Sequence, residues 1–414
     1  MGRDYRKGDK QAGEADRVAR FPNGGDGVVV NGYSEQWLGR GFPWVYREEV
    51  LGRTGQLKPG RTVSIRARGG KLLGTGIWDQ GKVEVRRFRP DAGPVDQDLL
   101  RDLVDAARVR RVIPPNTTAW RWIHGENDDL PGIRVDCWGD QLSVVLDSPS
   151  LLPILEPLVE VLTSSRETTA AWLSWRLAEG VGLPDGPLPD GLIWGRAERK
   201  DVVVEEAGIK MAVRPWDGLS AGVYSDMRDL RSWMAPHWMG RRVLNTFAFT
   251  GMFSVAAAVH GATEVTTVDL SAGSMDRARD NFLLNKLDAD SHRFDVRDTF
   301  KALDAYRRKG ERFDIVIADP PSFSHAEEGI WSAAKDYPRL IASCLRVLRP
   351  GGWLVVASNQ GTVSPKDFKK FILQGSHRTN RPLRLVHASS PPLDFPAALD
   401  FPESRYLKCW VLQA

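Results

Sequence analysis

The sequence predicts an α/β protein in three parts: a small N-terminal β-barrel, a central α+β domain and a C-terminal doubly wound parallel sheet. Two observations predict the C-terminal sheet, namely the strand–turn–helix–strand pattern of residues 243–269 and the strand with a double proline at residues 313–323. A third observation, a series of short strand-like runs between glycine turns over residues 28–90, indicates the barrel. The 414 residues suit two or three domains better than one core.

The composition, with 42% hydrophobic and 27% charged residues, is typical of a soluble globular protein. No apolar run is long enough to cross a bilayer, and the N-terminus lacks the apolar core of a signal peptide, so we expect a cytoplasmic protein without a membrane partner. The three cysteines are scattered, which predicts neither disulfides nor a zinc site. A net charge of +4 and a pI near 8.9 are compatible with a polyanionic partner without requiring one.

The N-terminal region divides into a tail and a barrel. Residues 1–27 are polar, glycine-rich and charged, so we expect a disordered tail. Residues 28–95 contain the runs RTVSIRA, LLGTGIW and KVEVRRF, whose spacing predicts a small β-barrel. Basic residues alternate with aromatic ones here, at Trp37, Arg40, Phe42, Trp44, Tyr46, Arg47, Arg53, Lys58, Arg61, Arg66 and Arg68. Stacking rings and guanidinium groups suit an RNA surface, but an ordinary barrel core with solvated arginines explains the pattern equally well.

Residues 96–200 predict a central α+β domain. Its expected elements are a helix over residues 96–112, a hairpin over 133–146 and a helix over 151–164. Residue types that bind metals gather in the loop before the hairpin, at His124, Glu126, Asp128 and Asp129. Because an acidic loop between strands is far more often a turn, no metal is proposed.

Residues 201–414 alternate between strands and helices, which predicts a parallel sheet with helices on both faces. Ser271 is expected to cap a helix that runs to residue 287. Further strands are expected at residues 313–318, 353–357 and 406–412.

Within this part, residues 243–269 predict a cradle for a nucleoside cofactor. A strand leads through the turn NTFAFTGMFS, and the next strand ends at Asp269, where a carboxylate bonds ribose hydroxyls in a doubly wound sheet. Phe247, Thr250 and Gly251 of the turn are expected to line the same site. The turn has one glycine where a pyrophosphate-binding loop has three, so S-adenosylmethionine fits better than NAD.

Two more acids are expected at strand ends. Asp298 is a candidate to accept a bond from the adenine amino group and also a candidate helix N-cap, and the two roles can coexist. Asp319 opens an Asp-Pro-Pro corner in which the prolines remove backbone donors and fix the course of the chain. We expect the acceptors of this corner to face a substrate.

Taken in order, these segments resemble the bacterial large-subunit ribosomal RNA methyltransferases that join a PUA domain, a central α+β domain and a Rossmann-like class I methyltransferase domain. The motifs that carry the resemblance are RGFPWVYREEV, HGENDDLPGIRVDCWGD, GLSAGVYSDMRDLR, LNTFAFTG, VTTVDLS, RDTF and DPPSF. The resemblance implies an S-adenosylmethionine-dependent enzyme that acts on 23S rRNA or on a large-subunit assembly intermediate.

The resemblance also implies roles for single residues. Asp269 would contact the donor's ribose, Asp298 its adenine and Arg228 its methionine carboxylate. Asp319 would contact the donor as well as the base, and Tyr224 and Asp226 would lie beside Arg228 and line the pocket.

The chain departs from the cytosine-C5 members of this family. Those enzymes form a covalent adduct through a cysteine thiolate, which stands in a Ser-Cys-Ser-Gly-like loop. The matching residues here are Ser358-Asn359-Gln360-Gly361, and the three cysteines, Cys137, Cys344 and Cys409, lie elsewhere. The sequence therefore disfavours the usual covalent route to C5.

Related enzymes that make 7-methylguanosine resemble this chain at two loops, with DPP-x-F-S and a Ser-Asn pair in place of the cysteine. By that resemblance, Phe323 stacks on a flipped base while Asp319 and the Pro320 carbonyl hold its edge. Asn359 bonds to the base or braces the loop. A guanine nitrogen, N7 above all, is therefore the favoured target, and cytosine C5 is the alternative.

For several other residues the sequence allows more than one role. The family has Lys and Gln where this chain has Ser220 and Met227, which indicates altered donor contacts or an altered RNA approach. His260 is expected to be structural, and His325 is more often a loop histidine than a catalytic one. The basic residues Lys366, Lys369 and Lys370 form either a solvated helix face or a phosphate contact.

Two other functions remain alternatives to methylation of RNA. An assembly factor that binds RNA without methylating it is suggested by the altered DMR and SNQG segments. A small-molecule methyltransferase is disfavoured by the basic and aromatic residues of the barrel. The sequence does not specify the oligomeric state, and a homodimer is one alternative.

Overall fold

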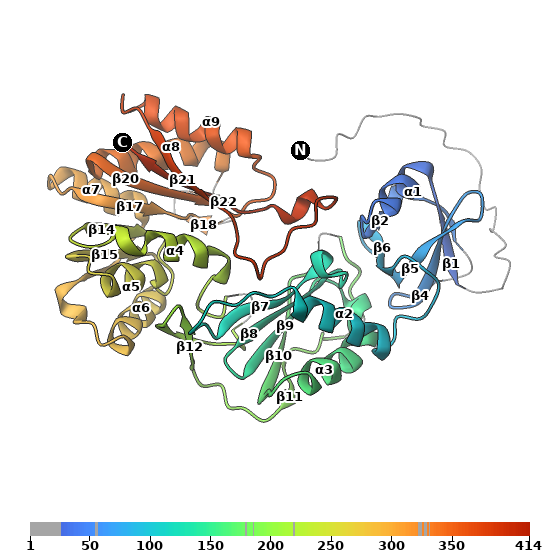
Figure 1. Ribbon diagram of the computed structural model, residues 1–414. Helices are drawn as coiled ribbons and strands as arrows, with labels where there is room; N and C mark the ends of the chain where they lie inside the picture. Colours follow the sequence, from blue (N-terminus) through green and yellow to red (C-terminus); the bar gives the residue numbers. More distant parts are fainter. Residues whose placement is uncertain are drawn as a thin grey trace.

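The computed structural model describes residues 26–53, 57–178, 180–184, 186–217, 220–321, 325–326, 329–330 and 332–414. Three sheets follow one another along the chain, and the central one lies between the other two (Figure 1). Most of the tail expected at residues 1–27 lies outside the described residues, but Gly27 already belongs to the first strand. Residues 96 and 201, where we place the domain boundaries, lie outside the strands of all three sheets, and the division itself stays a prediction.

The N-terminal sheet is an open, PUA-like barrel with strand order β2-β6-β5-β4-β1-β3. Strands β1 and β4 are parallel, and the other neighbours are antiparallel. Helix α1 was not expected, although Asn31 caps it by accepting a bond from Ser34 N. The elements are β1 (Gly27–Val30), α1 (Gly32–Gly39), β2 (Trp44–Tyr46), a 3₁₀ turn (Arg47–Glu49), β3 (Val50–Arg53), β4 (Thr62–Ala67), β5 (Leu72–Trp78) and β6 (Val83–Arg89).

The central sheet has the strand order β11-β10-β9-β8-β7, with helices α2 and α3 packed against its core. The structure confirms the predicted hairpin as β8–β9 and the predicted helices as α2 and α3. The elements are α2 (Gln97–Val109), β7 (Ala119–His124), β8 (Ile133–Trp138), β9 (Gln141–Leu146), α3 (Leu155–Ser164), β10 (Ala170–Trp175) and β11 (Gly191–Gly195), with 3₁₀ turns at Gly125–Asp128 and Pro149–Ile154.

Strands β12 (Val202–Glu206) and β13 (Ile209–Val213) correct one expectation, because they form a separate antiparallel hairpin and do not join the parallel sheet. Val204 and Met211 of the hairpin are buried in one core with Trp138 of the central domain and with helix α5. The hairpin therefore links the central domain to the C-terminal one.

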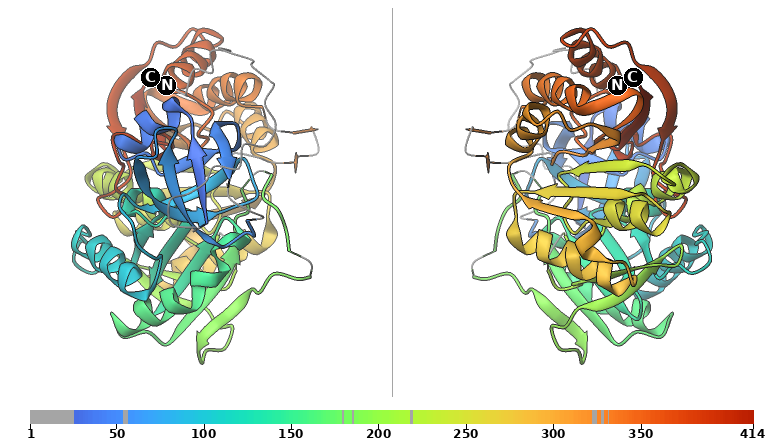
Figure 2. Two further views of the ribbon diagram at one scale, coloured as in Figure 1. Left: turned by 90° about the vertical axis from the view of Figure 1, so that its right-hand side faces the viewer. Right: turned by 90° about the vertical axis from the view of Figure 1, so that its left-hand side faces the viewer.

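The C-terminal sheet has the order β16-β15-β14-β17-β20-β22-β21, in which the first five strands are parallel and β22 is antiparallel to both neighbours. Successive strand residues face opposite cores: Val243 packs with α5, and Leu244 packs with α7 and α8. Helices therefore cover both faces, as predicted (Figures 1 and 2). Ser271 caps α6 as predicted, by accepting a bond from Ser274 N.

The elements of this part are α4 (Arg228–Met234), β14 (Arg242–Thr246), α5 (Met252–Val259), β15 (Glu264–Asp269), α6 (Ala272–Leu284), β16 (Arg293–Val296), α7 (Thr299–Arg308), β17 (Phe313–Ala318), β18 (His325–Ala326), β19 (Gly329–Ile330), α8 (Ala333–Val347), β20 (Leu348–Ser358), α9 (Pro365–His377), β21 (Arg384–Ser389) and β22 (Lys408–Gln413). Short 3₁₀ turns lie at Ser225–Met227, Ala235–His237, Ala289–Ser291 and Pro402–Ser404.

Residues 390–407, between β21 and β22, form a strap that reaches out of the C-terminal domain toward the other two (Figure 1). The ring of Phe395 lies 5.2 Å from that of His124 in the central domain. Farther along the strap, the ring of Phe401 lies 4.8 Å from that of Trp44 in the barrel. The strap therefore connects all three parts of the molecule.

Among the helices that the structure describes, none has both the length and the apolar character needed to cross a bilayer.

Candidate active site

The turn after β14 has an unusual backbone. Phe247, Phe249 and Gly251 all have positive φ angles, of 56°, 50° and 80°. Two aromatic residues in this left-handed region are energetically unfavourable, so the surrounding packing must enforce their conformation. Such enforced backbone is typical of ligand sites.

Close packing against α6 fixes the turn. A Cβ atom on Gly251 would lie 2.9 Å from Ala278 Cβ. Asn281 Nδ2 donates to Thr250 O at 3.0 Å, and the Thr250 hydroxyl donates to Gly222 O. The Thr250 side chain is therefore buried, and its hydroxyl already bonds within the protein. A direct contact of Thr250 with the donor stays a prediction.

Asp269 lies at the end of β15 beside this turn, as predicted. Its Oδ2 accepts a bond from Phe249 N at 2.9 Å, and its Oδ1 accepts one from Ser271 N at 3.0 Å. A carboxylate has about four lone-pair sites, so both oxygens keep acceptor capacity for the hydroxyls of a ribose. The carboxylate is held in place and half-buried, which fits the adenosyl part of S-adenosylmethionine.

Asp298 caps helix α7, since its Oδ1 accepts a bond from Lys301 N at 3.0 Å. The structure thus confirms the capping role, and a bond to adenine stays a prediction. The two roles remain compatible because the carboxylate is only partly buried.

Arg228 lies where the C-terminal domain meets the central domain and the strap. Its Nη1 donates to Ala119 O at 3.1 Å, its Nη2 pairs with Asp394 of the strap, and its side chain is 1% exposed. The structure therefore gives no support to the predicted contact with the donor's carboxylate, which stays a prediction. Asp394 Oδ2 also accepts a bond from Arg121 N at 2.9 Å, so one strap carboxylate joins two domains.

Asp319 lies at the end of β17, two strands from β15 in the sheet, and buried Pro320 follows it. The pKa of Asp319 is raised to about 7, mainly by burial and also by the Asp226 carboxylate, while Arg231 acts in the opposite direction. Asp319 therefore changes protonation near neutral pH, which suits a group that accepts or donates a proton at a base edge. Phe323, the predicted stacking residue, lies outside the described residues.

The neighbourhood of Asp319 includes a residue that the sequence did not indicate. The Tyr406 hydroxyl donates to Asp226 Oδ2 at 2.7 Å, and burial raises the pKa of both groups. Tyr224 lies on the same side, 46% exposed, with its hydroxyl 3.0 Å from Ser220 Oγ. The ring of Tyr224 lies 5.6 Å from that of Phe249, so Tyr224 connects the surroundings of Asp319 to the donor turn.

The loop after β20 follows the strand next to β17, so it begins at the same edge of the sheet as Asp319. Asn359 is exposed, in accord with a role at a substrate surface. Lys408 Nζ donates to Gln360 O at 2.7 Å, and burial lowers the pKa of this lysine to about 8. Because Lys408 also pairs with Ser358 across the strands, this residue holds the beginning of the loop. No sequence motif indicated this lysine.

All three cysteines are buried, and burial raises the pKa of each thiol. The Asp319 and Asp226 carboxylates raise the pKa of Cys409 further, since they disfavour a nearby thiolate. None of the three is in a suitable state for nucleophilic attack on a base.

The acidic loop of the central domain is structural. Asp128 is buried and pairs with Arg111, and Glu126 Oε1 accepts a bond from Trp44 Nε1 of the barrel at 3.0 Å. Within the described residues, no group of three or more His, Cys, Asp or Glu side chains is placed to hold a metal ion. His260, expected to be structural, bonds through Nδ1 to Ala256 O at 2.8 Å.

Comparison with known proteins agrees with this architecture. Residues 191–408 match the family described as S-adenosylmethionine-dependent methyltransferase, and residues 28–89 match a PUA-like domain. The chain is 32% identical to ribosomal RNA large subunit methyltransferase I of Shewanella amazonensis, with 90% of this chain and 96% of that protein covered. It is 31% identical to the protein of the same name from Tolumonas auensis, over 92% of this chain and 97% of the other.

A crystal structure described as that of a "putative methyltransferase" in complex with SAH superposes with a TM-score of 0.84 and 25% identity. The match covers 94% of this chain and 99% of the other. SAH is the donor without its methyl group, so the fold, the site and the relatives agree on the cofactor. The chain belongs to the S-adenosylmethionine-dependent methyltransferases, in the family that includes the enzymes named ribosomal RNA large subunit methyltransferase I.

Proposed function

We propose that this enzyme methylates a base of large-subunit ribosomal RNA. The observation that carries the proposal is the placement of Asp269 and Asp319 at the same edge of the sheet, on the two strands that flank β14. In this proposal Asp269 accepts bonds from the donor's ribose and Asp319 accepts a bond from the base edge, on either side of the donor turn. The PUA-like barrel and the names of the relatives support RNA as the substrate.

The protein's contribution is to hold the base and the donor in line. A base must leave its stack before it reaches such a site, and Asp319, Pro320 and Asn359 are the described residues that we expect to receive it. Asp269 would fix the ribose of S-adenosylmethionine, which supplies the methyl group. Because the pKa of Asp319 is about 7, this carboxyl group can hold or release a proton at neutral pH.

Two arguments bear on the target atom and point in opposite directions. The relatives favour the cytosine-C5 alternative, and they give no support to the expected preference for guanine N7. The usual C5 route, however, requires a thiolate, and the three cysteines of this chain are buried with raised pKa values. If C5 is the target, the nucleophile is therefore not a cysteine in the conformation described.

Nucleoside mass mapping of 23S rRNA from a deletion strain, before and after treatment with the purified enzyme and labelled donor, tests the proposal. We expect one methylated base to be lost in the strain and restored by the enzyme. Restoration of 5-methylcytidine identifies C5 as the target, and restoration of 7-methylguanosine identifies N7.

A matched pair of variants ties the reaction to the site. We expect Asp269→Ala to abolish both methyl transfer and donor binding by calorimetry, because it removes the ribose acceptor. Asp276→Ala, which removes an exposed carboxylate of α6, should change neither. Donor binding without any methyl group on RNA would contradict the proposal and favour an assembly factor.

A further inference from the structure

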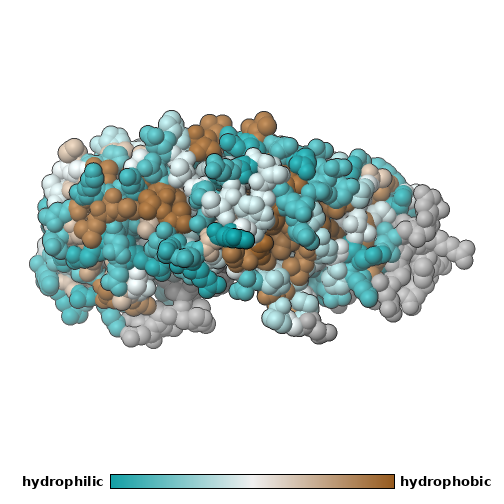
Figure 3. All heavy atoms as spheres, turned by 90° about the horizontal axis from the view of Figure 1, so that it is seen from below, coloured by the Kyte–Doolittle hydropathy of each residue, from teal (hydrophilic) through white to brown (hydrophobic). Residues whose placement is uncertain are grey.

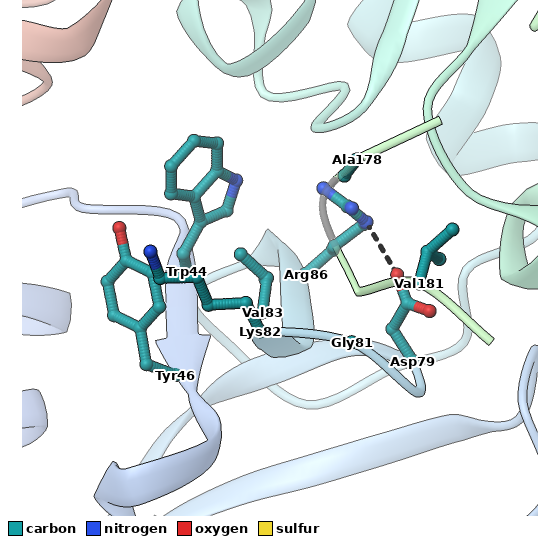
Figure 4. A pocket seen from close by; sticks show the side chains of 9 residues that line it. All are labelled: Trp44, Tyr46, Asp79, Gly81, Lys82, Val83, Arg86, Ala178 and Val181. Carbon is teal, nitrogen blue, oxygen red and sulfur yellow. Dashed lines mark hydrogen bonds and ion pairs between the residues drawn. The ribbon is translucent and has the colours of Figure 1, made fainter. Parts of the chain in front are cut away.

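A pocket lies between the barrel and the central domain, away from the donor site. It has a volume of about 170 Å³ and is lined by Trp44, Tyr46, Val83 and Arg86 of the barrel and by Ala178 and Val181 of the central domain. Figure 4 shows the Trp44 ring and the Arg86 guanidinium on opposite sides of the opening. We call this space the interdomain pocket.

Its aromatic wall is rigid. The Trp44 and Tyr46 rings are 6.1 Å apart at 81°, and Trp44 Nε1 donates to Glu126 Oε1 at 3.0 Å. The Phe401 ring of the strap packs edge to face against Trp44, with the ring centroids 4.8 Å apart. The Trp44 ring is therefore held in position before any ligand arrives, which reduces the entropic cost of stacking.

The polar wall contains a buried donor without a hydrogen-bond partner. Arg86 is 1% exposed; its Nε donates to Asp79 Oδ2 at 3.1 Å, and its Nη2 lies 3.1 Å from Asp147 Oδ1. Its Nη1 makes no hydrogen bond and has only a 4.0 Å contact with Glu126 Oε1. A buried guanidinium N–H without an acceptor is unfavourable, so an acceptor group that entered the pocket would gain a hydrogen bond from Arg86 Nη1.

The charged residues around Arg86 limit which chemical group can accept a bond from Nη1. The carboxylates Asp79, Asp147 and Glu126 lie around Arg86, and Arg134 is the second guanidinium that interacts with Glu126 and Asp147. Three carboxylates against two guanidinium groups leave no net positive charge that would attract a phosphate group. Burial raises the pKa of Glu126, and the Asp147 carboxylate raises it further, as expected where negative charge is already in excess. A neutral, planar group with a carbonyl or ring-nitrogen acceptor fits both the rings and the unpaired N–H.

The volume of the pocket limits the size of the ligand. Sites for drug-sized ligands usually measure about 300–1,000 Å³, so a pocket of about 170 Å³ takes little more than one ring system. Lys82 also lines the pocket, and its ammonium group suits the ribose-phosphate chain of a base that enters.

We propose that the interdomain pocket binds one nucleobase of the substrate RNA, a base that is not the one methylated. The base stacks on Trp44, and its acceptor edge receives the bond from Arg86 Nη1. This inference rests on the proposed function, because it takes RNA as the substrate. Its consequence is that the enzyme holds two bases of one RNA, one at the donor site and one between the barrel and the central domain.

A pocket-filling variant tests the proposal without disturbing the Arg86 ion pairs. Ala178→Trp fills the pocket, and Leu177→Trp adds the same ring at a neighbouring position that is 41% exposed and does not line it. We expect Ala178→Trp to weaken binding of an rRNA fragment by roughly tenfold or more, as loss of one stacked base does. Leu177→Trp should leave this affinity unchanged, and both variants should keep the melting temperature and the donor affinity of the wild type.

Ultraviolet crosslinking with 4-thiouridine- and 6-thioguanosine-substituted rRNA locates the base directly. We expect a crosslinked peptide that contains Trp44, and its loss in Ala178→Trp. If RNA is bound and methylated but neither the crosslink nor the loss of affinity is seen, this inference is wrong while the proposed function stands. If RNA is neither bound nor methylated, the proposed function fails as well. Calorimetry with nucleoside monophosphates that showed binding as tight as that of RNA would also overturn the inference, since the pocket would then serve a free nucleotide.

Discussion

At the scale of single residues, two carboxyl groups share the proposed methylation site. The Asp226 carboxylate raises the pKa of Asp319 because two negative charges in a desolvated site repel each other. The Tyr406 hydroxyl holds Asp226 in place at 2.7 Å. The pair therefore sets the pH at which Asp319 ionises, as in other sites where a neighbouring charge adjusts a catalytic group.

We predict that Asp226→Asn moves the pH dependence of methyl transfer to lower pH. The substitution removes a negative charge, so Asp319 ionises more easily and its pKa falls below about 7. The limb of the pH–rate profile that reports Asp319 should shift in the same direction, measured from pH 5 to 9 under single-turnover conditions. Asp229→Asn is the control, because Asp229 is exposed and does not contribute to the pKa of Asp319. An unshifted limb in Asp226→Asn would show that Asp319 does not limit the reaction.

The donor turn gives a second prediction at this scale. Gly251→Ala requires a side chain at φ 80° and places a Cβ atom 2.9 Å from Ala278 Cβ. We expect a loss of roughly 1–3 kcal/mol in the free energy of unfolding and weaker donor binding. Gly273→Ala, in helix α6 with nothing within 4 Å of the added Cβ, should instead be neutral or stabilising by about 0.5–1 kcal/mol. Chemical denaturation and donor calorimetry measure both effects, and equal losses would refute the steric argument.

At the scale of elements, the sequence predicted what local patterns determine and missed what depends on distant contacts. Apolar runs followed by a turn or a double proline predicted strands β14, β15 and β17, and the ends of these strands predicted the places of Asp269 and Asp319. Helix α1 was missed because its apolar pattern is short and weak. The β12–β13 hairpin was assigned to the parallel sheet because apolar strand patterns do not specify which strands pair.

The strap was missed for a different reason. The strap contains the sequence Leu-Asp-Phe-Pro twice, at residues 393–396 and 399–402, but the repeat does not indicate which residues it contacts. The first copy contributes Asp394 and Phe395 to contacts with the central domain, and the second contributes Phe401 to a contact with the barrel. Partners so far away in sequence leave no local pattern, so only the three-dimensional structure shows that Arg228 and Arg121 meet this segment.

The strap yields the prediction at this scale. Asp394→Ala leaves Arg228, which is 1% exposed, without its buried partner. Breaking a buried pair on one side typically costs about 3–5 kcal/mol, so we expect a loss of that size in the free energy of unfolding, measured by urea denaturation. Asp304→Ala breaks surface pairs with Arg307 and Arg308 and should cost less than about 1 kcal/mol. Similar losses in the two variants would show that the strap contact does not stabilise the fold.

At the scale of the whole molecule, the three parts share cores. Ile77 and Phe88 of the barrel strands belong to the same buried cluster as Trp122 of the central domain. Trp138 of the central domain belongs to the core of helix α5 in the C-terminal domain. On the face seen in Figure 3, apolar patches are separated by polar residues, which suits a molecule whose larger apolar surfaces are buried between its parts.

Shared cores predict cooperative unfolding. Independent domains would unfold in separate steps, but here the barrel cannot unfold without exposing part of the central core. We therefore expect one calorimetric transition with a van't Hoff enthalpy close to the calorimetric one. Phe88→Ala should move the whole transition to lower temperature, with a cost of roughly 3–5 kcal/mol, and should not split it. A separate low-temperature transition in this variant, with the remainder unchanged, would mean that the barrel is an independent unit. If the barrel is independent, deletion of residues 1–95 tests whether the barrel binds RNA. If the core is shared, the same deletion also damages the central domain, and the point variant Ala178→Trp is the better test of RNA binding.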